Sequence, residues 1–301
     1  EFLLNKVRSA TAYSESSSTF ASSVSQIEDI LLPGESNLGN ALGRFFEGLQ
    51  ELASDPADLI GRTVAIEQAK LVSENFKQLH SLLEEMKEGL FIQTEHLLDE
   101  VNMLTVELQR VNKQLAAGSQ TKANNSLLDA RDYLIDKLNE YVEVSVSLDA
   151  RGAAKVILGD NPNGPGLVTK DKVNKLGVEQ KSNELLFFLE PQAERLLTKR
   201  IDGGAVHGLS SAYLTANDVM EDVDRLAFDV ITSVNAIHKR GLTLDGTAGG
   251  DFFQSLRLDL SASPVNTGNA SATLRVIDPD AITPQRVKFN YDKANDIWSG
   301  T

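Results

Sequence analysis

The sequence predicts a mainly α-helical protein with β inserts, in which an elongated bundle of long helices is followed by a small β-rich domain. Three observations predict this fold. Between Asp55 and Gly118 apolar residues recur at helical spacing, and no proline follows Pro56 until Pro162. Residues 142–190 contain short segments in which apolar and polar residues alternate, as in half-buried strands. From residue 256 onward, strand-like segments are separated by Ser, Pro, Asn, Gly and Asp.

The N-terminal part is predicted to be helical. Residues 1–32 carry apolar side chains at steps of three and four, and the serines at 14–18 are expected to weaken this helix. Pro33-Gly34 ends it, and residues 38–53 form a second helix with one apolar face.

The long segment that follows is predicted to be a single helix, with Asp55 as its N-cap and Pro56 in its first helical position. At 1.5 Å per residue it would be about 90 Å long. One apolar row repeats every seven residues, which predicts a slightly underwound helix packed against partner helices. The row consists of Phe76, Leu83, Leu90, Leu97, Leu104 and Val111. A neighbouring row drifts by one position, as expected for a helix of 3.6 residues per turn, from Leu79 and Met86 to Val101, Leu108 and Leu115.

A helix at about 125–141 leads into the β insert, predicted at about 142–190. Strands are expected at 142–148 and 155–158, joined across the Arg151-Gly152 turn, and then at 166–169, 173–178 and 184–189.

Helix returns near Gly204, and Thr215 to Asp218 resemble a capping box that starts another helix. This helix carries a second apolar seam, so it is the expected packing partner of the long helix. The seam consists of Val219, Val223, Leu226, Val230, Val234 and Ile237. Strands are predicted at 256–260, 272–277 and 286–291. We therefore expect a helical rod domain at 1–255 and the beginning of a β-rich outer domain at 256–301, in a chain cut from a longer protein at both ends.

Composition narrows the function classes. With 29 basic and 43 acidic residues the net charge is −14, so the average surface repels nucleic acid and anionic membranes. No apolar run is long enough to span a bilayer, and the first residues do not have the pattern of a signal peptide. The absence of cysteine excludes disulfides, thiolate zinc sites and cysteine nucleophiles.

No catalytic, cofactor-binding or metal-binding residue is predicted. The four histidines are not spaced along the sequence as metal ligands usually are. They are His80, His96, His207 and His238. Four acidic residues lie close together in the sequence, at Asp218, Glu221, Asp222 and Asp224. Carboxylates are favourable near the N-terminus of a helix, and this explains the group better than a calcium site does. Gly246 to Gly250 predict a loop with unusual dihedral angles rather than a phosphate cradle. In Leu127 to Asp132, charges on a helix indicate a salt-bridged or capping role.

Several of these stretches, in this order and spacing, resemble the flagellar hook-associated protein 1 family, the first hook-filament junction protein of bacteria. The resemblance rests on Glu1 to Leu4 with Arg8, on residues 38–56, on Arg62 and Ala69, on Val101-Asn102 and Val111-Asn112, on Leu127 to Asp132, and on Val234 to Gly246 followed by Phe252-Phe253. The stretch from Val234 to Gly246 with Phe252-Phe253 is the most specific, and Leu127 to Asp132 match the family's element closely.

The resemblance implies a flagellin-like core of long helices and a structural, non-enzymatic protein of the extracellular flagellum. Family members are exported through the flagellar type III channel without a cleaved signal peptide. They form a ring that joins the hook protein to the filament through the second junction protein. The family's terminal helical segments are missing here, so this chain is expected to be monomeric. The alternative from the residues alone is a helical sensor or coiled-coil domain of a receptor, and an enzyme is a more distant third.

Overall fold

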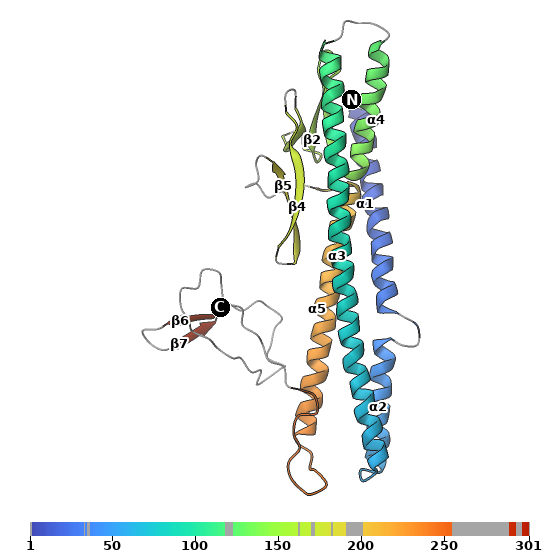
Figure 1. Ribbon diagram of the computed structural model, residues 1–301, viewed down its shortest axis with the longest axis vertical. Coiled ribbons are helices and arrows are strands. Elements are labelled where there is room, and N and C mark those ends of the chain that lie inside the picture. Colours follow the sequence, from blue (N-terminus) through green and yellow to red (C-terminus); the bar gives the residue numbers. More distant parts are fainter. Residues whose placement is uncertain are drawn as a thin grey trace. The chain divides into compact units, whose positions relative to one another are not determined.

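The computed structural model describes residues 2–32, 34, 37–117, 123–161, 163–169, 172–181, 183–190, 201–254, 289–292 and 297–300. The chain divides into unit 1, Glu1–Asp222, and unit 2, Val223–Thr301, with the boundary inside the last helix. The helices are α1 (Phe2–Leu31), α2 (Leu38–Ser54), α3 (Leu59–Ala117), α4 (Ala123–Tyr141) and α5 (Gly204–His238). In unit 1, α1, α2 and α4 pack against α3 (Figure 1). The predicted mainly α fold with β inserts is confirmed.

Helix α1 continues without a break through the serine-rich stretch. The serines at 14–18 therefore do not interrupt the helix, and their weakening effect stays a prediction. Serine disfavours helices partly because its hydroxyl competes for backbone groups. Here the buried Ser16 hydroxyl instead lies 2.8 Å from Nδ1 of His207 on α5.

The beginning of α3 differs from the prediction. Asp55 caps the C-terminus of α2, and Pro56 lies in the turn between the two helices. The side chain at the start of α3 is Asp58, whose carboxylate accepts hydrogen bonds from the amides of Ile60 and Gly61 at 2.9 and 3.0 Å. Aspartate is a favoured N-cap residue, so Asp55 and Asp58 are both plausible helix starts. Only Asp58 is followed directly by the continuous helical hydrogen bonds of α3.

Helix α3 has one buried stripe along its length, and this stripe contains polar side chains. In the predicted seven-residue row, Leu83, Leu90 and Val111 are buried, but the other three members are only half-buried. The neighbouring row is buried at Leu79, Val101, Leu108 and Leu115, whereas its remaining member, Met86, is half-buried. Burial repeats every eleven residues, at Leu79, Leu90, Val101 and Asn112 and again at Leu83, Thr94 and Thr105. Seven-residue intervals are buried as well, at Ala65, Val72 and Leu79 and again at Val101, Leu108 and Leu115, so the predicted underwinding stays a prediction.

The predicted β insert is confirmed as two antiparallel sheets in unit 1. One sheet has the order β1 (Val144–Leu148), β2 (Ala154–Leu158), β3 (Gly166–Val168). The other pairs β4 (Lys175–Lys181) with β5 (Glu184–Glu190), and β4 runs along α3 (Figure 1). Strand β4 begins two residues later than predicted and extends to Lys181.

Helix α5 is continuous from Gly204, where φ is +79°, so the helix start predicted at Thr215 is wrong. The hydroxyl of Thr215 donates to the carbonyl oxygen of Ser211 inside the helix, at 3.1 Å. The buried seam begins earlier than predicted and comprises Val206, Leu209, Tyr213, Ala216, Met220 and Val223. Of the predicted seam, Val223 is buried, but Leu226 and Ile237 are 42% and 70% exposed.

Unit 2 contains the C-terminal part of α5, the loop that follows it, and an antiparallel pair of strands, β6 (Phe289–Asp292) and β7 (Ile297–Gly300). The strands predicted at 256–260 and 272–277 lie outside the described residues. β6 overlaps the end of the strand predicted at 286–291. The domain boundary at residue 255 stays a prediction. No described helix combines the length and the apolar character needed to cross a bilayer.

Candidate functional site

Two of the four histidines are held by hydrogen bonds within the fold, and His96 is exposed and lines a groove beside α3. His207 is bonded to Ser16, and Nδ1 of His238 lies 2.7 Å from the carbonyl oxygen of Gly250. His80 and His96 lie on α3. Within the described part of the chain, no three His, Asp or Glu side chains are grouped so as to hold a metal ion.

The acidic group does not lie at the start of a helix, so the helix-dipole explanation for it is wrong. Its four members are exposed positions in the middle of α5. Glu221 accepts a hydrogen bond at 2.9 Å from the side-chain amide of Asn217, one helical turn earlier. The group therefore forms a solvated helix face.

Two asparagines of α3 hold the β insert. The side-chain amide of Asn112 donates to the carbonyl oxygen of Ala154 at 2.7 Å and accepts from its N–H at 2.8 Å. Asn102 makes the same pair of bonds with Leu176 of β4, at 2.9 and 2.8 Å. In each case the asparagine side chain bonds to both the backbone N–H and the backbone C=O of one strand residue, as a neighbouring β-strand would. We call these contacts of Asn102 and Asn112 amide clamps.

The clamps explain the repeated Val-Asn pairs of the sequence. Val101 and Val111 are buried in the helix seam, and the asparagine that follows each of them is directed to a sheet. Because successive residues of a helix are about 100° apart, one Val-Asn pair serves both the bundle and the β insert. The clamps occupy the backbone N–H and C=O of Ala154 at the start of β2 and of Leu176 near the start of β4, so these groups are closed to pairing with other chains.

A third amide clamp lies in unit 2. The side chain of Asn235 donates to the carbonyl oxygen of Phe253 at 2.9 Å and accepts from the amides of Phe252 and Phe253, both at 2.8 Å. Next to it, the His238 ring lies edge-on to Phe252, with centroids 5.4 Å apart. These contacts tie the chain after α5 back onto the helix, and they account for the Asn-x-x-His spacing.

The glycine-rich loop between α5 and this clamp is a defined turn. Gly246 has φ of +81°, which confirms the predicted unusual dihedral angle. The amide of Thr243 donates to the carbonyl oxygen of Thr247 at 2.8 Å. The Thr243 hydroxyl, then the Asp245 backbone amide and the Thr247 hydroxyl, lower the pKa of the Asp245 carboxyl from its ordinary value. The carboxylate therefore stabilises the turn at neutral pH, and that contribution is lost on acidification.

Residues 127–132 support the turn between β1 and β2. Arg131 is buried and donates to the carbonyl oxygen of Gly152 at 2.5 Å and to the carboxylate of the adjacent Asp132 at 2.7 Å. Gly152 has φ of +83°, and a Cβ there would lie 2.8 Å from Leu128. The predicted salt-bridged role is confirmed, and its purpose is to hold the hairpin.

Lys87 is a buried charge in the α3 stripe that the sequence analysis missed. Its ammonium group lies 3.2 Å from Oδ1 of Asn217, 3.5 Å from the partly exposed Glu84 carboxylate, and 5.5 Å from the centroid of the Tyr213 ring. The Tyr213 hydroxyl accepts a bond from Gln180 at 2.7 Å. Burial raises the pKa of Tyr213, and the bond from Gln180 opposes this shift. The network joins α3, α5 and β4.

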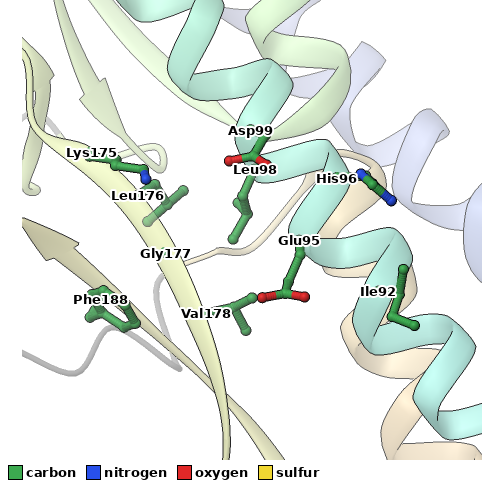
Figure 2. A pocket seen from close by; sticks show the side chains of 10 residues that line it. All are labelled: Ile92, Glu95, His96, Leu98, Asp99, Lys175, Leu176, Gly177, Val178 and Phe188. Atoms are coloured by element: carbon green, nitrogen blue, oxygen red, sulfur yellow. The ribbon is translucent and has the colours of Figure 1, made fainter.

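An open groove of about 310 Å³ lies between α3 and the β4–β5 hairpin. Figure 2 shows Leu98 and Val178 in it, with the Glu95 carboxylate directed from α3 towards the strand. Asp99 and Phe188 also line it. This groove could not be predicted from the sequence, because its two walls are distant along the chain and the residues that line them form no motif.

Replacing Asn235 with alanine is expected to loosen the 250–253 segment. The variant leaves two backbone amides and a carbonyl without their partner, so hydrogen exchange at Phe252 and Phe253 should accelerate by about tenfold or more. Exchange mass spectrometry or NMR measures this. Asn75→Ala is the matched control, because the Asn75 amide bonds only to Leu71 of its own helix. Unchanged exchange at Phe252 and Phe253 in Asn235→Ala would contradict the clamp.

The chain is similar to proteins of the bacterial flagellum. The family model described as "Flagellar hook-associated protein FlgK helical domain" matches residues 24–253. "Flagellar hook-associated protein 1" of Bacillus subtilis is 29% identical over 266 residues, which cover 78% of this chain and 52% of that protein. The Escherichia coli protein of the same name is 24% identical over 311 residues, covering 100% and 56%.

A solved structure has the same fold. The flagellar hook junction protein FlgK from Burkholderia pseudomallei superposes with a TM-score of 0.79 at 22% sequence identity, over 99% of this chain and 56% of that one. The chain thus spans about half the length of the relatives it matches. Because the family model covers most of the chain and includes all three amide clamps, the chain belongs to the family of the flagellar hook-associated protein FlgK, through its helical domain.

Proposed function

We propose that this chain is the helical part of a structural protein that joins the flagellar hook to the filament. Membership of the FlgK family and relatives named as flagellar hook-associated proteins support this function. The role belongs to the whole protein, of which the relatives show about twice this length.

The amide clamps are the observation within the chain that carries the proposal. Asn102, Asn112 and Asn235 all fall in the stretches of the family resemblance, and each one holds backbone of another segment. Their chemistry is used to fix long-range geometry rather than to act on a substrate. We therefore propose a building block without catalysis, in which clamped helices and sheets present a stiff surface to neighbours.

The partners in this proposal are the hook protein, the second junction protein and further copies of the same protein in a ring. The location is the extracellular flagellum, reached through the flagellar type III channel without a cleaved signal peptide. Residues 1–255 act as the rod domain with its β insert, and residues 256–301 belong to a β-rich outer domain. The isolated chain is monomeric, which small-angle scattering with light scattering would measure.

The full-length protein should restore filament attachment in a strain of its own species that lacks it. The measurement is the number of attached filaments and the amount of flagellin in the medium. Flagellin lost to the medium, although the protein is exported normally, would overturn the proposed function.

A further inference from the structure

The groove between α3 and the β4–β5 hairpin combines apolar side chains with two carboxylates on its α3 wall, and Lys175 lines its strand wall. Leu98 is buried, and Val178 and Phe188 are half-buried. Glu95 and Asp99, one turn apart on α3, are exposed at its edge (Figure 2). Among the described residues, neither carboxylate has an ion pair. The groove therefore suits a short apolar segment whose basic end lies against the α3 wall, away from Lys175.

The loop after α5 has the complementary character. Leu242 and Leu244 are 75% and 66% exposed, although the turn that carries them is fixed by internal hydrogen bonds of Thr243 and Thr247. Arg240 is exposed just before them, and within the described part of the chain it has no carboxylate partner. A fixed turn with two exposed leucines and a free cation has already lost the conformational entropy that binding would otherwise cost.

We propose that the loop Arg240–Leu244 of one copy of this chain docks into the groove at Glu95 and Asp99 of a neighbouring copy. Leu242 and Leu244 cover the apolar side chains of the groove, and the guanidinium of Arg240 meets the two carboxylates. The volume of about 310 Å³ accepts a few side chains but not a helix. This inference rests on the proposed function, in which copies assemble side by side.

The docking is heterologous, because the groove and the loop are different surfaces of one chain. Each copy offers its groove to one neighbour and its loop to another, which is the type of contact that closes into rings. Such a small contact buries much less surface than a stable dimer requires. It is therefore compatible with a monomeric isolated chain and becomes effective when the assembly holds copies close together.

Cysteine cross-linking tests this contact directly, because the chain has no cysteine of its own. Two single variants, Asp99→Cys and Leu242→Cys, are mixed at high concentration and treated with a short bifunctional maleimide. The matched control replaces Asp99→Cys with Glu100→Cys, the next exposed position of the same helix, which does not line the groove. We expect the mixed dimer to form with a yield about fivefold higher at position 99 than at position 100.

Exchanging the charges of Glu95 and Arg240 tests whether their ionic interaction contributes to the contact, or whether the two cysteines are only close together. Cross-linking should fall when Glu95→Lys is added to the Asp99→Cys partner, and it should recover when Arg240→Glu is added to the Leu242→Cys partner. It should also weaken with rising salt.

Equal yields at positions 99 and 100, or no recovery in the charge exchange, would overturn the docking. So would cross-linking of Asp99→Cys with Leu242→Cys only when both are in one chain. Filament attachment tests the proposed function separately. Attachment by the wild-type full-length protein, together with a failed cross-linking result, would reject this contact alone.

Discussion

Replacing Asn112 with leucine is expected to lower the free energy of unfolding of unit 1 by about 2–5 kcal/mol. Its amide satisfies both the N–H and the C=O of the buried Ala154. Leucine fills a similar volume but leaves both groups without a partner, and each buried unsatisfied group costs about 1–3 kcal/mol. Denaturant unfolding of the 301-residue chain measures the loss, and hydrogen exchange at Ala154 localises it.

Asn102→Leu is the matched control for this effect. The same two bonds join Asn102 to Leu176, but the side chain of Asn102 is only half-buried. Water can then hydrogen-bond to part of the backbone that the substitution leaves unpaired, so the free energy of unfolding should fall by only about 1–2 kcal/mol. A loss at Asn112 no larger than that at Asn102 would show that burial does not determine the strength of the clamps.

Much of the fold is readable from the sequence because burial leaves a periodic trace. The segment 184–190 alternates along its length and is the strand β5, and the β1–β2 hairpin turns at the predicted glycine. The errors in the predicted helix starts occur where the same local pattern is present at two positions of the sequence. Asp55-Pro56 and Asp58 both suit a helix start, and Thr215 to Asp218 imitate a start inside α5. In each case tertiary packing decides between them.

The clamps could not be derived from local patterns. Asn102 and Asn112 are polar residues next to an apolar seam, which periodicity alone interprets as solvent-facing positions. Their partners are 74 and 42 residues away in the sequence. The family resemblance marked both Val-Asn pairs without giving a reason for the asparagine, and only the folded chain shows which backbone groups it satisfies.

Replacing Asn217 with leucine is expected to destabilise unit 1 by about 3 kcal/mol, because it removes the nearest oxygen from the buried ammonium group of Lys87. The remaining carboxylate, that of Glu84, is farther away and partly exposed to solvent. Lys87→Met should cost only about 1 kcal/mol, since methionine fills the space and carries no charge that needs a partner. Denaturant unfolding of the variants measures both values.

The double variant Lys87→Met/Asn217→Leu decides whether the buried charge causes this loss. With both groups apolar, stability should return to within about 1 kcal/mol of the wild type, so that the two substitutions are strongly non-additive. Thr94→Val is the control at another buried polar position of α3, whose hydroxyl bonds only to Leu90 of its own helix. It should change stability by less than about 1 kcal/mol. If the double variant is as unstable as the sum of the single ones, the loss comes from packing around Asn217, and Lys87 is not a coupled charge in the α3 stripe.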